Sequence, residues 1–242
     1  MRPFVLLATR AEDAAADGEH AAMLRYAGLR PSELIRIRLE AGPMPPIDLD
    51  AISGVIVGGS PFDASSTNKS EVQVRVEAEM AALLDRLVPA DFPFLGACYG
   101  VGTLGVHQGA VIDTTFGEPI GPVTITLTDE GRADPLLAGM PASFDAFVGH
   151  KEACRVLPPG ATLLASSPTC PVQMFRVRTN LYATQFHPEL DIEGISTRIR
   201  VYRDYGYYQP AEADDVLGGV EGADVDAAHR ILSAFVRRYA RA

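Results

Sequence analysis

Three side chains with the chemistry of a cysteine-dependent hydrolase stand at Cys98, His187 and Glu189. Cys98 lies in Gly96-Ala97-Cys98-Tyr99-Gly100, between the apolar run 92–95 and a helix-compatible stretch. This order predicts a strand, a tight turn and a helix, which is the arrangement of a nucleophile elbow. The flanking glycines are expected because the turn leaves no room for a Cβ, and the helix would favour thiolate at the sulfur. A G-x-C-x-G string also fits a buried, inert cysteine, so the rest of the chain must support the site.

His187 and Glu189 offer what a cysteine nucleophile needs, a base for its proton and an acid that orients the base. His187 ends an apolar run, and the following Pro188 cannot extend a sheet. Glu189 lies two residues on, a spacing that can place its carboxylate beside the second ring nitrogen. A lone histidine is more often a surface or packing residue, but this context favours catalysis. We therefore predict Cys98, His187 and Glu189 as a catalytic triad.

An oxyanion formed by attack of the sulfur needs hydrogen-bond donors. The turn Gly58-Gly59 ends another apolar run, and Tyr99 directly follows the nucleophile. We predict the backbone N–H groups at Gly59 and Tyr99 as the donor pair, with Gly58 beside them. Gly59 also fits an ordinary turn between a strand and a helix.

Strands and helices alternate in the first half of the chain. The patterns predict strands at 3–9, 33–39, 51–57 and 92–95, and helices at 18–29, 71–88 and 99–106. This order indicates βαβ units and a mostly parallel sheet with helices on both faces. Ligands of such sheets bind at the carboxyl ends of the strands, where both glycine turns lie.

Closely spaced strands in the second half predict antiparallel hairpins. We expect strands at 123–128, 144–148, 161–166, 172–177 and 181–186, and helices at 132–138, 191–205 and 225–240. The stretch 207–222 reads as a connection. We predict one α/β domain over residues 1–242, with 191–242 as a C-terminal helical extension. The tyrosines of this extension are interpreted as packing or subunit contacts, which leaves a homo-oligomer open: Tyr202, Tyr205, Tyr207 and Tyr208.

Composition argues against several classes of protein. Hydrophobic residues make up 47% of the chain and no apolar run approaches the length of a membrane span, while the net charge of −10 argues against nucleic acid as a partner. The apolar start is too short for a signal peptide, so we expect a first strand in a cytoplasmic protein. No zinc-type spacing occurs, and we expect neither metal nor cofactor. Cys154 and Cys170 are expected to be structural, and His20 and His229 to lie on the surface.

Three ordered motifs resemble those of class I glutamine amidotransferases. They are Gly58-Gly59-Ser60-Pro61, Gly96-Ala97-Cys98-Tyr99-Gly100 and Gln185-Phe186-His187-Pro188-Glu189. The likeness covers 1–189, including 161–167 and more loosely 117–121, and is closest to stand-alone members similar to the amidotransferase domain of GMP synthetase. It implies a flavodoxin-like three-layer αβα fold and a glutamine or related γ-amide substrate. It also implies that Cys98 forms a thioester and releases ammonia, that His187 shuttles the proton and that Glu189 orients it.

Two departures from the family pattern bear on the substrate. Gly102 stands four residues after the cysteine, where family members usually carry a glutamine that helps to hold the substrate. In Val148-Gly149-His150-Lys151-Glu152 only His150 matches the family, so the resemblance implies substrate binding for His150. Lys151 and Glu152 fit either solvated loop charges or replacement contacts.

Three functions therefore stay open. The first is a glutamine amidotransferase-like enzyme that passes ammonia to a separate synthetase or acceptor protein, since the chain has no phosphate-binding G-x-x-x-x-G-K-[ST] motif. The second is a self-sufficient hydrolase of γ-glutamyl or related amides, which the Gly102 departure favours. The third is a catalytically silent binding or regulatory module.

Overall fold

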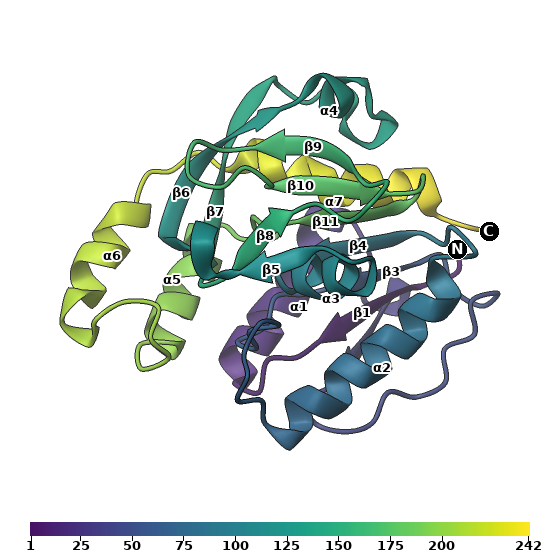
Figure 1. The fold of residues 1–242 in the computed structure, drawn as a ribbon, viewed down its shortest axis with the longest axis horizontal. Coiled ribbons are helices and arrows are strands. Elements are labelled where there is room, and N and C mark those ends of the chain that lie inside the picture. Colours follow the sequence, from purple (N-terminus) through teal and green to yellow (C-terminus); the bar gives the residue numbers. More distant parts are fainter.

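The computed structural model describes all residues from 1 to 242, and its centre is a nine-stranded sheet (Figure 1). The strands follow the order β2-β1-β3-β4-β11-β10-β9-β6-β7, and β5 and β8 form a separate pair. Their bounds are β1 Phe4–Ala8, β2 Leu34–Arg38, β3 Gly54–Val57, β4 Phe94–Ala97, β5 Val111–Asp113, β6 Glu118–Leu127, β7 Ser143–His150, β8 Ala153–Val156, β9 Thr162–Ser166, β10 Met174–Val177 and β11 Leu181–Thr184.

Five neighbouring strands, from β2 to β11 in the sheet order, pair in parallel. β1, β3, β4 and β11 are buried along their whole length, as expected for parallel strands covered by helices on both faces. β2 forms the edge, and its alternating sequence is only partly buried. Because parallel strands end at the same edge of a sheet, the turns after β1, β3, β4 and β11 meet there.

The other four strands of the sheet pair in an antiparallel manner, from β10 through β9 and β6 to β7. The predicted α/β fold, with parallel strands first and antiparallel strands in the second half, is confirmed. One bridge of this half matters for the site, because His187 pairs with Phe147 of β7. The segment that follows β11 is therefore held against β7.

Helices cover both faces of the sheet (Figure 1). Alternate residues of β1 separate the two layers: Phe4 and Leu6 pack with α1 and α7, while Val5 and Leu7 pack with α2 and α3. The bounds are α1 Asp13–Ala27, α2 Glu71–Leu87, α3 Tyr99–His107, α4 Asp129–Ala133, α5 Ile192–Val201, α6 Ala213–Val220 and α7 Asp226–Tyr239. No helix is both long and apolar enough to cross a membrane.

Local capping explains several helix ends. Ser70 begins α2 by accepting a hydrogen bond from the Gln73 N–H, and Asp191 begins α5 in the same way with Gly194. Gly28 ends α1 with a φ of 70°, a conformation that glycine adopts without strain.

Some predicted elements differ from the structure. The first helix begins at Asp13 rather than residue 18, and the stretch 207–222, read as a connection, contains α6. The short strands β5 and β8 were not predicted, because three or four residues are too few to give a periodic pattern. His229, expected on the surface, is buried; its Nδ1 lies 2.7 Å from the carbonyl oxygen of Pro188, and its ring stacks on Tyr26.

Candidate active site

Cys98 lies at a sharp turn between β4 and α3 with φ 52° and ψ −80°. This backbone conformation is strained for a residue with a Cβ, and it persists because its N–H donates to the Thr184 carbonyl of β11 at 2.7 Å. A Cβ on Gly96 would lie 2.5 Å from Gly100 Cα, so Gly96 must be glycine. A Cβ on Gly100 would meet nothing within 4 Å, so the expectation that both flanking positions are crowded is wrong for Gly100. The geometry is that of a nucleophile elbow.

His187 and Glu189 follow β11 and lie beside this elbow. His187 Nδ1 is 2.8 Å from Glu189 Oε1, and both side chains are buried. Cys98 and His187 line one cavity, so the fold brings the sulfur and the imidazole to the same place. No hydrogen bond joins the sulfur and the imidazole in this structure.

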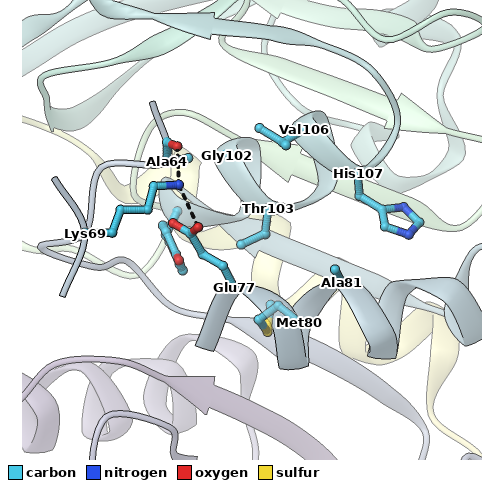
Figure 2. A pocket seen from close by; sticks show the side chains of 10 residues that line it. Ala64, Lys69, Glu77, Met80, Ala81, Gly102, Thr103, Val106 and His107 are labelled. Carbon is cyan, nitrogen blue, oxygen red and sulfur yellow. Dashed lines mark hydrogen bonds and ion pairs between the residues drawn. The ribbon is translucent and has the colours of Figure 1, made fainter. Parts of the chain in front are cut away.

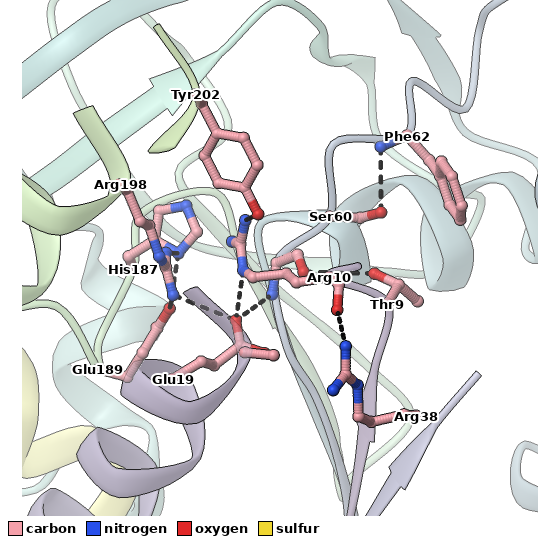
Figure 3. Close-up of polar contacts among 12 residues, drawn as sticks. Thr9, Arg10, Glu19, Arg38, Ser60, Phe62, His187, Glu189, Arg198 and Tyr202 are labelled. Carbon is pink, nitrogen blue, oxygen red and sulfur yellow. Dashed lines mark hydrogen bonds and ion pairs between the residues drawn. The ribbon is translucent and has the colours of Figure 1, made fainter. Parts of the chain in front are cut away.

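The site contains a buried charge network that the sequence did not predict (Figure 3). Arg198 of α5 lies 2.9 Å from Glu189 Oε1 and 3.0 Å from His187 Nδ1. It also donates to Glu19 of α1 at 3.1 Å. Glu19 Oε1 in turn accepts from Arg10 Nε at 3.0 Å, so two arginines and two glutamates balance one another out of contact with solvent.

The electrostatic surroundings keep the resting site neutral at the two reactive groups. Burial raises the pKa of the Cys98 thiol to about 12, although Arg10 and Arg198 act in the opposite direction. Burial also lowers the pKa of His187, against the effect of Glu189. Burial alone would raise the pKa of Glu189, but His187 and Arg198 hold it below its usual range. The expectation that α3 would favour thiolate is therefore wrong for the resting site, where a thiol faces a neutral imidazole.

The predicted oxyanion donors differ in availability. The Gly59 N–H donates to Glu19 Oε1 at 3.1 Å, so it is already used. A Cβ on Gly58 would lie 2.3 Å from Glu19 Oε2, which explains why this turn requires glycine for close approach. The Tyr99 N–H is the first of α3 and has no acceptor within the helix.

Two small cavities flank Cys98, of about 20 and 30 Å³. Each has room for only one or two water molecules. Tyr207 lines both, and Tyr202 lines the second. Lys151 Nζ lies 4.6 Å from the centre of the Tyr207 ring and 3.6 Å from Asp63. The interpretation of these tyrosines as packing or subunit contacts is therefore incomplete, because two of them form walls of the site.

His150 and Glu152 shape the neighbouring wall. His150 is buried, with Nδ1 2.9 Å from the Glu152 carbonyl oxygen and Nε2 2.8 Å from Glu118 Oε2, so it offers no free nitrogen to the cavity. The Glu152 carboxylate accepts from the N–H groups of Ala64 and Ser65 at 2.5 and 2.7 Å. Neither alternative considered for Glu152 describes this role, which is to hold the loop that follows β3.

The donor atoms of Glu118, His150 and Cys170 lie within 4.8 Å of one another, a grouping that could hold a metal ion. Glu118 Oε2 already accepts from His150 and from Gln173 Nε2 at 2.7 Å, while Thr169 donates to Oε1. These hydrogen bonds use the oxygens that a metal would need. We interpret the group as a polar cluster that fixes His150.

A larger cavity of about 110 Å³ lies between α2 and α3 (Figure 2). Lys69 crosses its mouth, donating to the Ala64 carbonyl at 2.7 Å and to Glu77 at 2.6 Å. Tyr99 and Gly102 line both this cavity and the one beside Cys98. The Tyr99 hydroxyl is buried there without a hydrogen-bond partner. Space for a substrate therefore adjoins the elbow on the side of Gly102.

A signal for the charge network was present in the sequence. Glu19 occupies the buried stripe of α1, four residues from Ala15 and from Met23, and Arg198 occupies that of α5 beside Ile195 and Ile199. A charge on an apolar stripe needs a buried partner. Arg10 follows β1 just as the two glycine turns follow β3 and β4, so its place in the sequence already put it at the same edge of the sheet.

Comparison of this chain with known proteins identifies its family. A family model described as glutamine amidotransferase class-I matches residues 29–199. A glutamine-hydrolyzing GMP synthase subunit of Thermoplasma acidophilum is 27% identical over 146 residues, covering 60% of this chain and 66% of that protein. The corresponding protein of Thermococcus kodakarensis is 28% identical over 168 residues, covering 69% and 80%. The GMP synthase of Porphyromonas gingivalis is 29% identical over 147 residues, and the match spans only 26% of its length.

Solved structures with the same fold include a glutamine amidotransferase from Thermotoga maritima, with a TM-score of 0.78, 20% identity and full coverage of both chains. A glutamine amido transferase from Methylobacillus flagellatus gives a TM-score of 0.71 at 18% identity, covering 100% of this chain and 97% of that one. At these identities the likeness establishes the fold alone.

Proposed function

The chain belongs to the class I glutamine amidotransferase family, and from that premise we propose that it hydrolyses a γ-carboxamide through a thioester on Cys98. One observation carries the proposal: the strained elbow places Cys98 on a cavity shared with His187, whose Nδ1 is bonded to Glu189. A half-buried thiol and a neutral base in one cavity have the residue types and the surroundings of an acyl-transfer site.

The reaction begins with proton transfer from the Cys98 thiol to the neutral ring of His187. The sulfur adds to the amide carbon, and the carbonyl electron pair moves to oxygen. When the carbon–nitrogen bond breaks, His187 gives its proton to nitrogen, ammonia leaves and a thioester remains. Water, deprotonated by His187, then adds to the thioester, and the sulfur leaves with the returned proton. The sum is one amide and one water giving one acid and one ammonia.

Glu189 stabilises the imidazolium that forms in this sequence. Its bond to Nδ1 fixes the ring so that Nε2 is the nitrogen left for the sulfur or the water. Arg198 lies against the same nitrogen and carboxylate, and it keeps Glu189 ionised. His187, bonded to Glu189, is therefore expected to become positively charged only when a negative charge forms on the sulfur or the substrate beside it.

Ammonia release to a second protein is the first candidate for the wider role. Two of the relatives are named as glutamine-hydrolyzing subunits of GMP synthase, and a protein named as one subunit implies a further subunit in those enzymes. By analogy, we propose that the acceptor chemistry of this protein resides in another chain and that glutamine is the amide.

A self-sufficient hydrolase of larger γ-glutamyl amides is the second candidate. Gly102 lacks the usual glutamine side chain, and the cavity between α2 and α3 adjoins this position with an unpaired Tyr99 hydroxyl. These features favour a substrate that extends beyond free glutamine.

The decisive experiment measures ammonia released from L-glutamine, and glutamate together with the free amine released from γ-glutamyl conjugates, each with and without cell extract. Activation by extract on glutamine supports the amidotransferase, and activity on conjugates alone supports the hydrolase. His187→Ala should lower the rate more than Glu189→Gln, because proton transfer contributes more than orientation. Failure of a chloroketone analogue of glutamine to label Cys98, with no amide hydrolysed, would instead favour a silent binding module.

A further inference from the structure

Arg10 carries a hydrogen-bond donor that nothing in the protein uses. Its side chain is buried, with the residue only 4% exposed, and it is held at two points: Nε donates to Glu19 at 3.0 Å and Nη1 to the Tyr202 hydroxyl at 3.1 Å (Figure 3). Nη2 makes no hydrogen bond within the protein, and Arg10 lines the cavity beside Cys98, so this donor is open to a group that enters there. A charged donor held in place but unused indicates a partner that arrives from outside the protein.

Nη2 lies next to the imidazole of His187 at the turn after β3. A Cβ on Gly59 would lie 2.4 Å from Arg10 Nη2 and 2.7 Å from His187 Cε1, so both groups border the same face of the turn. Arg10, Cys98 and His187 line one cavity. An anion that forms next to the sulfur would therefore form within reach of this guanidinium.

We propose that Arg10 is a catalytic residue whose Nη2 donates a hydrogen bond to the oxyanion that forms when Cys98 adds to a carbonyl. The proposal rests on the function proposed above. It also supplies a further donor where one of the two predicted backbone donors, the Gly59 N–H, is already bonded to Glu19. An oxyanion site needs preorganised donors in fixed positions, and Arg10 is fixed by Glu19 and Tyr202.

The charges of the site are consistent with this role. At rest the two arginines are balanced by Glu19 and Glu189, and the thiol and imidazole are neutral. Attack by the sulfur creates one positive charge on His187 and one negative charge on the substrate oxygen. Glu189 faces the first, and Arg10 would face the second. Each new charge thus meets an opposite one that is already in place.

The first test replaces Arg10 and measures hydrolysis of the best γ-carboxamide substrate. Arg10→Gln should lower kcat by roughly 100-fold or more with little change in KM, the effect of losing one oxyanion donor. Tyr202→Phe is the matched control, because it removes the bond to Nη1 and leaves Nη2 in place; its loss should stay within about tenfold. Melting temperatures check that both variants are folded.

A merely structural role would give a different pattern of rescue. In Arg10→Ala, guanidinium chloride at non-denaturing concentrations should restore kcat at least several-fold, while the same salt should do nothing for Tyr202→Phe. Equal losses in both variants, or no rescue, would overturn the assignment.

A second measurement does not depend on enzymatic activity, because it follows the alkylation of Cys98. Iodoacetate carries a carboxylate and iodoacetamide does not, so the ratio of their rates reports an anion-binding donor, and any change in thiol pKa cancels from it. Arg10→Gln should lower the ratio several-fold. If no amide is hydrolysed yet the ratio falls, the proposed function fails and the anion-binding role of Arg10 stands. If the ratio is unchanged, Arg10 does not bind an anion next to the Cys98 sulfur.

Discussion

The backbone N–H of Gly59 donates to the buried carboxylate of Glu19 at 3.1 Å, although the two residues lie 40 positions apart. The same Glu19 oxygen accepts from Arg10 and from Arg198. One carboxylate therefore joins the turn after β3, the turn after β1 and helix α5, which carry three walls of the site. Glu19 links the geometry of the proposed triad to that of the proposed oxyanion site.

Glu19→Gln should lower the free energy of unfolding by about 3 kcal/mol, because it removes the only carboxylate that pairs with buried Arg10, while Arg198 keeps Glu189. Chemical denaturation measures the change. Asp17→Asn is the control on the same helix: it breaks the ion pair with Arg36, which lies near the surface, and should leave stability unchanged within error. Equal stability of the Glu19→Gln variant and the native protein would contradict the importance of the network.

The acidic limb of the pH profile of kcat/KM should lie below pH 6.5, the ordinary pKa of histidine. The proposed mechanism needs neutral His187, and burial together with the nearby arginines lowers the pKa of its ring. The base thus stays neutral to a lower pH than usual, and activity is lost as the pH falls through the lowered pKa. Steady-state rates between pH 4.5 and 8 measure the limb.

Arg198→Gln tests the cause of that shift. Removing the cation beside Nδ1 should raise the pKa of His187 and move the acidic limb toward higher pH. A limb that stays in place would mean that Arg198 does not act on the ring.

Cys98→Ser and Cys98→Gly should both be inactive, but they should differ in stability. Cys98 has a φ of 52°, a conformation that glycine adopts without strain. Cys98→Gly should therefore raise the free energy of unfolding by about 1 kcal/mol over Cys98→Ser. Denaturation curves and a glutaminase assay measure the two properties. Residual activity of a tenth or more in Cys98→Ser would remove the elbow from the mechanism.

The sequence predicted the elbow and the residues that follow β11, because both combine a strand signal with an abrupt stop and a reactive side chain. The sequence did not predict the charged side chains that surround Cys98, His187 and Glu189 and shift their pKa values. Arg10, Glu19 and Arg198 come from three elements, and no local pattern reveals that one oxygen joins them. The thiolate expectation failed for the same reason, since it considered the helix end but not the burial of Cys98.

The tyrosines of the C-terminal part show a second limit of sequence reasoning. Their spacing carried no chemical motif, and only the fold places Tyr202 and Tyr207 beside a cysteine about a hundred positions earlier in the chain. A role that depends on contact between segments far apart in the sequence can be recognised only from the folded structure.

Tyr207→Ala should make Cys98 more reactive toward iodoacetamide by about tenfold. Tyr207 lines both small cavities at the sulfur, and each has room for only one or two waters, so removing the ring should open the site to a reagent or a substrate. Tyr205→Ala is the matched control, because Tyr205 belongs to the same segment and is exposed, with its hydroxyl bonded to Glu12. The alkylation rates of both variants at one pH measure the effect. If the two variants react alike, the segment as a whole controls access and the ring of Tyr207 has no special part in it.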